Sequence, residues 1–423
     1  MRDWFRSLNP QLPRTVQTLQ LGGLANAFGN GVTLPFALIY LHNVQGIGLG
    51  TAGLILATNA VVSIVAGPLS GTLVDRLGGQ RILATALVFL AVGYAGYAIV
   101  DTPWKGFLVA AVTGIGNGFF WPAQSTLITQ LTPAAKRHTA FAMQRVVMNL
   151  GVGLGALVGG LIATTSRPAT FDVLWFVNAA TFVVYLGVLL ARVPEPASPE
   201  ARAASHGGSY GPVLRDRTFM GVVALNTLFI FAGMSGFELL PVYAKNEAAV
   251  TETMIGIVFF VNTVVIVLAQ LPVTKASEGH RRMRILGLLG VLWAGCWLLV
   301  PLAGLWVTGA AAALLLAVVM AVFGVGECLH GAVQGPLVAD LADPGLIGRY
   351  MALSALSWQV GFALGPALGG FALAASPSGT WLVAAGICVV AGAAALKLER
   401  SLPRAVRTTP VPRAPRMQAA GVQ

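Results

Sequence analysis

The chain has 423 residues, of which 56% are apolar and only 10% are charged, and its formal net charge is +11. Soluble globular domains carry about 25% charged residues, so this composition excludes an ordinary soluble protein. The net charge alone would also fit a nucleic-acid-binding protein, but the cationic residues are spread over alternate loops instead of forming one basic segment.

Twelve apolar stretches follow one another along the chain and are almost free of charge. An α-helix rises about 1.5 Å per residue, so about 20 apolar residues cross a hydrocarbon layer of about 30 Å. The sequence therefore predicts an all-α membrane protein with twelve transmembrane helices. We place them at 16–41, 49–74, 82–100, 106–131, 139–163, 173–191, 219–244, 254–274, 285–302, 307–339, 350–375 and 381–396.

Lys and Arg residues are distributed unevenly between the two sides of these stretches. With the N-terminus placed in the cytoplasm, the inner segments hold 22 of them and the outer loops hold only Lys105, Arg167 and Lys245. This bias follows the positive-inside rule and predicts that both termini are cytoplasmic. It also makes nucleic acid the weaker explanation of the positive charge. We recognise no cleavable signal peptide and no paired cysteine spacing, so we expect neither disulfides nor a metal site.

The segment 192–217 is the longest internal polar stretch and is rich in Pro, Ala, Ser and Gly, as is typical of a linker. It divides the chain into an N-terminal six-helix bundle at 1–191 and a C-terminal six-helix bundle at 218–397. The linker itself and a tail at 398–423 are expected in the cytoplasm.

The two halves repeat each other at an offset of 210 residues. Corresponding pairs are Gly114 and Gly324, Gly116 and Gly326, Gln124 and Gln334, Gly151 and Gly361, Gly155 and Gly365, and Gly159 and Gly369. Parallel repeats of six helices are a known transporter design, in which the substrate site lies between the halves near the membrane midplane.

A short motif, G-T-L-V-D-R-L-G-G-Q-R at 71–81, follows the second stretch. Its acid, Asp75, can accept hydrogen bonds from free N–H groups at the start of a neighbouring helix, where the helix dipole favours an anion. An ordinary basic loop is the alternative. The motif resembles the signature G-x-L-x-D-R-x-G-R-K/R of the major facilitator superfamily, except that Gly79 and Gln80 replace the basic pair.

A second motif carries the resemblance further. The GxxxGPxxGG pattern of drug:proton antiporters is present in the fifth stretch with Ala156 in place of proline, and it is complete in the eleventh. The antiporters often carry an arginine four residues before the position of Gly114, where this chain has Ala110. The resemblance implies the major facilitator fold, with Asp75 bracing the helix start at 348–351. It implies a conformational switch made of Gly71, Asp75, Arg76, Gly78, Arg81, Gly151, Gly155 and Gly159.

Three charged side chains, Arg145, Glu238 and Glu327, fall inside the apolar stretches. A charge at the membrane midplane costs about 2.5–3.5 kcal/mol or more, so such groups usually face a cavity or a partner. Glu327 and Glu238 are the candidate proton carriers, and Arg145 and His330 are expected to tune them, because His330 shares a helix face with Glu327. The structural alternatives are a bond between helices for Glu327, a boundary position for Glu238, snorkelling for Arg145 and a core position for His330.

Polar and aromatic side chains within the stretches are candidates for the wall of a substrate cavity. Each amide can instead join two helices, and each aromatic ring can instead belong to the core or face lipid. The predicted cavity residues are Asn26, Asn30, Gln124, Asn149, Asn226, Gln334, Phe231 and Trp358. Further aromatic candidates are Phe28, Phe119, Phe120, Trp121 and Phe237.

Together these features predict a proton-coupled secondary transporter that exports a lipophilic or amphipathic small molecule by alternating access, and not an enzyme. The glycine-rich run 151–155 lies inside an apolar stretch without a preceding strand, so it does not fit a dinucleotide-binding loop. No Walker sequence is present, and an ion gradient is the expected energy source. We expect no cofactor, and we expect a monomer in a bacterial cytoplasmic membrane, in contact with lipid, protons and substrate. Two alternatives stay open: a proton-coupled importer or facilitator of a polar metabolite, and a non-transporting receptor or scaffold.

Overall fold

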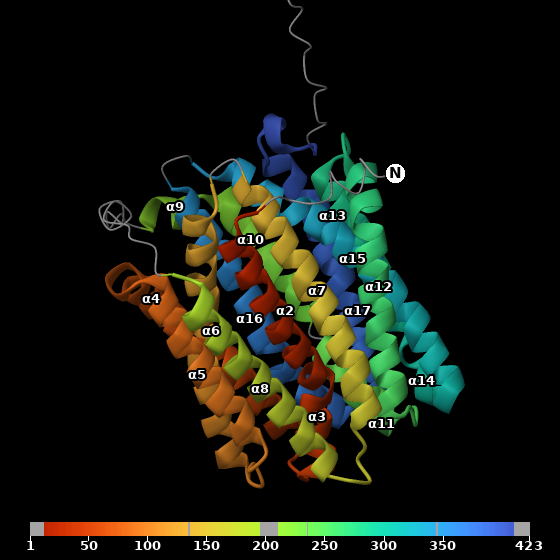
Figure 1. The fold of residues 1–423 in the computed structure, drawn as a ribbon. Helices are drawn as coiled ribbons and strands as arrows, with labels where there is room; N and C mark the ends of the chain where they lie inside the picture. The colour runs from red at the N-terminus through yellow and green to blue at the C-terminus, as the bar shows by residue number, and fades with distance from the viewer. Residues whose placement is uncertain (1–11, 134–135, 195–209, 235, 344–345, 410–423) are drawn as a thin grey trace, which may run out of the picture.

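The computed structural model describes residues 12–133, 136–194, 210–234, 236–343 and 346–409, with the side chains of Asp75, His138, Ile347 and Gly348 left out. Within these residues, twelve helical segments are long and apolar enough to cross a membrane (Figure 1). They coincide with the twelve predicted stretches, so the predicted fold class is confirmed.

The first bundle is drawn from red to yellow-green in Figure 1. Its α2 and α8 pack together, α2 also packs against α7, and α6 lies against both α4 and α5. The helices are α2 (Arg14–Thr33), α3 (Ala37–Ile39), α4 (Leu49–Leu77), α5 (Gly79–Tyr97), α6 (Pro103–Leu131), α7 (Arg137–Ile162) and α8 (Ala169–Arg192).

The second bundle is drawn from green to blue. Its α12 packs against α15, and α13 packs against α15 and α17. The long helices are α10 (Arg217–Phe229), α11 (Gly236–Asn246), α12 (Glu252–Ser277), α13 (Arg282–Leu299), α15 (Gly309–Leu341), α16 (Ile347–Ala375) and α17 (Pro377–Leu398). The short helix α9 (Gly211–Arg215) lies within the predicted linker, and α14 (Leu302–Leu305) follows α13.

The first and seventh spans are not continuous α-helices. A 3₁₀ turn at Leu34–Phe36 and a π turn at Tyr40–Val44 interrupt the first span, and a π turn at Ile230–Met234 separates α10 from α11. Pro35 has no backbone N–H and cannot continue the helical hydrogen bonding. Single π turns inside helices are frequent at functional sites. The first lies at the end of its span and the second in the middle of its span.

The two bundles meet along two helix pairs, α4 with α16 and α7 with α12, which we call the seams. Small residues let the backbones approach closely there. A Cβ added to Gly53 would lie only 2.1 Å from Pro366 O, and one added to Gly160 would lie 2.7 Å from Glu252 O. Both contacts lie toward the end that carries residues 44–48, 163–168 and 247–251. We call it the outer end, following the prediction from charge.

The residues after α17 fold back onto the opposite end of the second bundle. Thr409 N donates to His280 O at 3.0 Å, and Arg282 N donates to Arg407 O at 2.8 Å. The Arg282 side chain is fully buried and is ion-paired with Asp340, at the far end of α15. Part of the predicted tail, up to Thr409, is therefore packed against the loop between α12 and α13.

Candidate functional site

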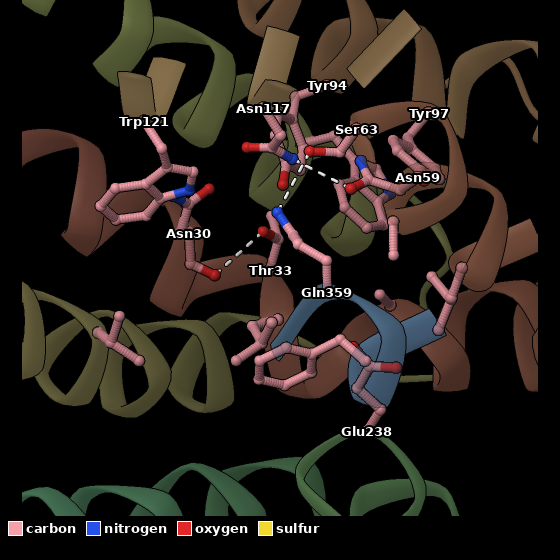
Figure 2. A pocket seen from close by; sticks show the side chains of 17 residues that line it. Asn30, Thr33, Asn59, Ser63, Tyr94, Tyr97, Asn117, Trp121, Glu238 and Gln359 are labelled. Atoms are coloured by element: carbon pink, nitrogen blue, oxygen red, sulfur yellow. Dashed lines mark hydrogen bonds between the residues drawn. The ribbon is translucent and has the colours of Figure 1, made fainter. Parts of the chain in front are cut away.

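A cavity of about 330 Å³ lies between the two bundles (Figure 2). Its wall combines amide, hydroxyl and aromatic side chains, and of the described residues that line it Glu238 is the only charged one. The polar and aromatic members are Asn30, Thr33, Asn59, Ser63, Tyr94, Tyr97, Asn117, Trp121, Trp175, Glu238, Gln359 and Phe362. Most belong to the first bundle, while α11 supplies Glu238 and α16 supplies Gln359 and Phe362.

The polar part of the wall contains two hydrogen-bonded groups of amide and hydroxyl side chains. Asn117 Nδ2 donates to Asn59 Oδ1 at 3.1 Å, and Asn59 Nδ2 donates to Thr113 Oγ1 at 2.7 Å. Gln359 Nε2 reaches across from the second bundle to Ser63 Oγ at 3.4 Å, as Figure 2 shows. These bonds fix the orientation of the amides, so the cavity presents a defined set of polar groups to a ligand.

The aromatic part of the wall is flat and rigid. The rings of Tyr97 and Trp175 stack with centroids 4.6 Å apart, and Tyr94 lies at 6.4 Å from Trp175. Such rings offer a large apolar surface with little loss of conformational entropy. A ligand that fills this cavity therefore meets an apolar face and a polar face, which suits an amphipathic molecule.

Glu238 enters this cavity from the first turn of α11, directly after the π turn of the seventh span. Its Oε2 atom is buried and has no hydrogen-bond partner among the described residues. A buried carboxylate without a partner is costly when it is ionised. The position is therefore suited to a group that either carries a proton or binds a cation.

Glu327, the other predicted proton carrier, is not among the described residues that line the cavity. Asn262 Nδ2 donates to Glu327 Oε2 at 2.9 Å and to Met320 O at 3.1 Å. Glu327 thus takes part in a contact between α12 and α15 inside the second bundle. A bond between helices, the structural alternative for this residue, is present, and a role in proton transfer stays a prediction.

His330 lies in a different network from Glu327. Its Nε2 contacts Asn226 Oδ1 at 2.8 Å, and Asn226 Nδ2 donates to Ser357 Oγ at 2.6 Å. The imidazole ring also lies 5.4 Å from the ring of Trp358. The network joins α10, α15 and α16, and no described hydrogen bond links His330 to Glu327.

Arg145 is exposed on α7 and faces the other bundle. A Cβ added to Gly331 on α15 would lie 3.4 Å from Arg145 Nη1. Within the described part of the chain, no acidic side chain forms an ion pair with this guanidinium. The guanidinium group therefore lies beside α15 of the second bundle, and a role in tuning the proton carriers stays a prediction.

Of the eight predicted cavity residues, the structure places Asn30 in the wall. Asn26 is buried and accepts a hydrogen bond from Asn30 at 3.3 Å. Gln124 and Gln334 are buried within their own bundles and carry amide atoms without a described partner. The remaining predicted residues are not among the described lining: Asn149, Asn226, Phe231 and Trp358. Of the further aromatic candidates, Trp121 lines the cavity, whereas Phe28, Phe119, Phe120 and Phe237 do not.

Several lining residues were not predicted from the sequence. Asn59 and Ser63 are four residues apart in an otherwise apolar span, a spacing that puts both on one helix face and could have marked them. Asn117 lies inside the repeated motif of the fourth span. For Tyr94, Tyr97 and Trp175 the sequence carries no comparable signal, because aromatic residues also fill the core.

The predicted switch glycines of the fifth span face their own bundle. Added Cβ atoms at Gly151, Gly155 and Gly159 would meet α2, the one at Gly155 at 2.1 Å from Phe28 O. Gly153 and Gly160, in contrast, face α12 across the seam. Of the fifth-span glycines, these two are therefore the ones that permit close contact between the bundles.

The loop motif is only partly described. Gly78 ends α4 with φ 96° and ψ 154°, a conformation that essentially only glycine adopts. An added Cβ at Gly71 would meet nothing within 4 Å, and Arg76 and Arg81 are exposed. The side chain of Asp75 lies outside the described residues, so its contact with 348–351 stays a prediction.

The sequence profile of the Major Facilitator Superfamily matches residues 19–251 and again residues 223–420. The chain belongs to the major facilitator superfamily. It is thus a multi-pass membrane transporter.

Similar proteins include transporters that are named for different activities. The "Na(+), Li(+), K(+)/H(+) antiporter" of Planococcus maritimus is 24% identical over 408 residues, which cover 86% of this chain and 89% of that protein. "Multidrug resistance protein MdtH" of Cronobacter sakazakii is 27% identical over 344 residues, covering 81% of this chain and 82% of that protein. The solved structure of a variant of the nucleoside transporter NupG has a TM-score of 0.77 at 14% identity and covers 91% of this chain and 99% of that one, which shows the shared fold.

Proposed function

We propose that this transporter exports a lipophilic or amphipathic small molecule across a bacterial cytoplasmic membrane in exchange for protons. The observation that carries the proposal is the carboxylate oxygen of Glu238, which has no described partner and lies in a cavity whose other described lining residues are uncharged. Similarity to a multidrug resistance protein supports the export of a small molecule, and similarity to a cation/proton antiporter supports the exchange for protons.

The coupling follows from the chemistry of one shared carboxylate. In a cavity of low dielectric constant, Glu238 is stable when it is protonated or when a cationic group lies against it. Occupation by substrate on one side displaces the proton, and protonation on the other side displaces the substrate. Each conformational cycle then exchanges one ligand for the other, as an antiporter requires.

The size and shape of the cavity favour a small organic molecule. Its volume of about 330 Å³ falls in the range of about 300–1,000 Å³ that is usual for ligand pockets. The stacked rings of Tyr97 and Trp175 would hold the apolar part of the substrate, and the amides of Asn59, Asn117 and Gln359 would bind its polar groups.

The same amides support a second candidate, proton-coupled import of a polar metabolite. Asn59, Asn117 and Gln359 provide more hydrogen-bonding groups than a purely lipophilic substrate needs. The two candidates differ in direction. Overproduction of an exporter protects cells against toxic substrates, whereas overproduction of an importer sensitises them. A receptor or scaffold, the third possibility, would move no solute in purified vesicles.

The experiment uses purified protein in vesicles with an imposed pH gradient and a panel of cationic, neutral and anionic amphipathic compounds. We expect the gradient to drive accumulation of cationic amphiphiles. Glu238→Gln, which is neutral like the protonated carboxyl group, should abolish this accumulation and weaken the binding of cationic compounds, while neutral compounds still bind. Asp101→Asn is the matched control, because Asp101 is exposed in an outer loop and pairs with Lys105 at 2.6 Å. Undiminished accumulation by the Glu238→Gln variant would remove Glu238 from the coupling mechanism.

A further inference from the structure

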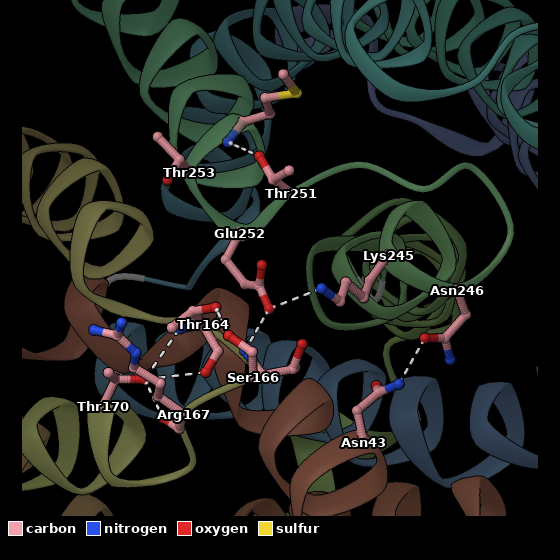
Figure 3. A network of polar contacts seen from close by, with 12 residues as sticks. Asn43, Thr164, Ser166, Arg167, Thr170, Lys245, Asn246, Thr251, Glu252 and Thr253 are labelled. Carbon is pink, nitrogen blue, oxygen red and sulfur yellow. Dashed lines mark hydrogen bonds and ion pairs between the residues drawn. The ribbon is translucent and has the colours of Figure 1, made fainter.

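A cluster of polar contacts holds the two bundles together at the outer end, away from the cavity (Figure 3). We call it the outer cluster; it comprises Asn43, Gly160, Thr165, Lys245, Asn246, Glu252 and Thr253. None of the predicted site residues belongs to it.

Glu252, the first residue of α12, is the centre of this cluster. Its side chain is buried, and its Oε1 accepts a hydrogen bond from Thr165 N at 2.8 Å and an ion pair from Lys245 Nζ at 2.9 Å. Thr165 lies in the loop after α7, in the first bundle, whereas Lys245 lies on α11, in the second. One carboxylate therefore bonds to both bundles at once, as Figure 3 shows.

Two further bonds cross between the bundles beside Glu252. Thr253 Oγ1 donates to Gly160 O at 2.9 Å, and Asn43 Nδ2 donates to Asn246 Oδ1 at 2.7 Å. The backbones are in close contact here, since a Cβ added to Gly256 would lie 2.6 Å from Ala156 O. Opening of the outer end has to separate all of these groups.

We propose that Glu252 is the latch of the outer gate. When the gate opens, its bond to Thr165 breaks, while the ion pair with Lys245 persists because both residues belong to the second bundle. The carboxylate is then never left without a counter-charge, which would be strongly unfavourable for a group leaving a buried site. The gate therefore loses one charge-assisted hydrogen bond and the neutral bonds beside it, and it does not lose an ion pair.

Because the hydrogen bond crosses between the bundles and the ion pair does not, the latch can be both firm and reversible. A hydrogen bond to a charged acceptor contributes more to stability than a neutral one, so Glu252 biases the outer end toward closure. A cross-bundle ion pair would hold more tightly and would have to be resolvated in every cycle. Lys245 keeps the acceptor charged and in place without crossing the seam.

The test measures how often the outer seam opens. Ala156→Cys places a thiol on the α7 face that contains Gly153 and Gly160, where Ala156 is 1% exposed. The rate at which a membrane-impermeant thiol reagent modifies it from the outer side reports the open fraction. The natural cysteines, Cys296, Cys328 and Cys388, are buried, and the protein without Ala156→Cys gives the background.

In the protein that carries Ala156→Cys, we expect the further change Glu252→Gln to raise the modification rate by about five- to tenfold. This factor is the difference between a charged and a neutral hydrogen-bond acceptor. Glu247→Gln is the matched control and should leave the rate unchanged, because Glu247 is an exposed acid in the loop just before α12 and has no described ion pair. If the Glu252→Gln protein fails to insert into the membrane, Thr165→Pro takes its place. Proline has no backbone N–H, so this change removes the donor of the hydrogen bond to Glu252 and should raise the modification rate by the same factor.

Equal rates in the Glu252→Gln, Thr165→Pro and Glu247→Gln proteins would overturn the latch. The persistent ion pair has its own readout: Lys245→Met should lower the melting temperature of the protein in detergent, because it leaves a buried carboxylate unpaired. An unchanged melting temperature would contradict the role given to Lys245. Neither measurement uses a substrate or a pH gradient, so their failure is distinguishable from failure of the proposed function.

Discussion

Replacing Gly160 by alanine tests how tightly the α7–α12 seam closes. An added Cβ would lie 2.7 Å from Glu252 O and 2.9 Å from Gly256 Cα. Favourable contacts between such atoms begin at about 3.5 Å, so the helices must separate by about 0.8 Å to admit one methyl group. If they stay in place, overpacking of this kind costs about 1–3 kcal/mol.

That cost applies only while the outer end is closed, because Glu252 and Gly256 belong to the other bundle. The closed state should therefore lose about 5- to 150-fold in population relative to the open state. Double electron–electron resonance between spin labels at Arg167 and Glu247, two exposed outer positions on opposite bundles, measures the separation. We expect longer distances to gain weight in the Gly160→Ala protein.

Gly187→Ala is the control for this measurement. Gly187 also lies inside a helix, α8, but an added Cβ there would meet nothing within 4 Å. Both substitutions change helix propensity equally, so only the contact across the seam differs. Indistinguishable distance distributions in the two variants would refute the conclusion that the seam is closed by backbone contact at Gly160.

Two further predictions concern the second bundle. Asp340→Asn should destabilise the protein by about 3 kcal/mol, because the fully buried Arg282 loses its counter-charge. The loss is measured as a lower melting temperature in detergent, and the control Asp101→Asn, in an exposed loop, should not lower it. Glu327→Leu should lower the free energy of unfolding by about 1 kcal/mol or more, because it removes the acceptor of Asn262 Nδ2. Glu327→Gln should keep that hydrogen bond and the melting temperature. Equal losses of stability in both variants would show that this bond is not the source of the stability.

The fold could be predicted from the sequence because membrane helices obey a simple physical rule. A membrane span needs about 20 apolar residues, and twelve such runs in one chain indicate twelve membrane-spanning helices. The spacing of repeated glycines likewise indicated two related halves. The irregular turn at Ile230–Met234 could not be predicted, since no proline or glycine pair marks its start and its hydrogen bonding depends on the packing around it.

The site was harder to predict, because a hydropathy pattern does not determine how a helix is rotated about its axis. Glu238 and Asn30 were identified as polar groups in spans, and they do reach the cavity. Glu327 and Asn226 gave the same signal, yet they bond to neighbouring helices within their own bundle. Glu252 lies two residues before the predicted span 254–274, where an acid gives no signal of function. Its importance follows only from the hydrogen bond that Thr165 N of the other bundle donates to it.

The glycine contacts along the seams have a consequence for the speed of the conformational cycle. Where helices meet through interlocked side chains, sliding or rocking requires each ridge to leave its groove. At Gly53 and Gly160 the surfaces that meet are smooth stretches of main chain. Such surfaces interlock less than packed side chains do, so we expect the polar bonds of the outer cluster to contribute more to the barrier for opening, where single substitutions can adjust it.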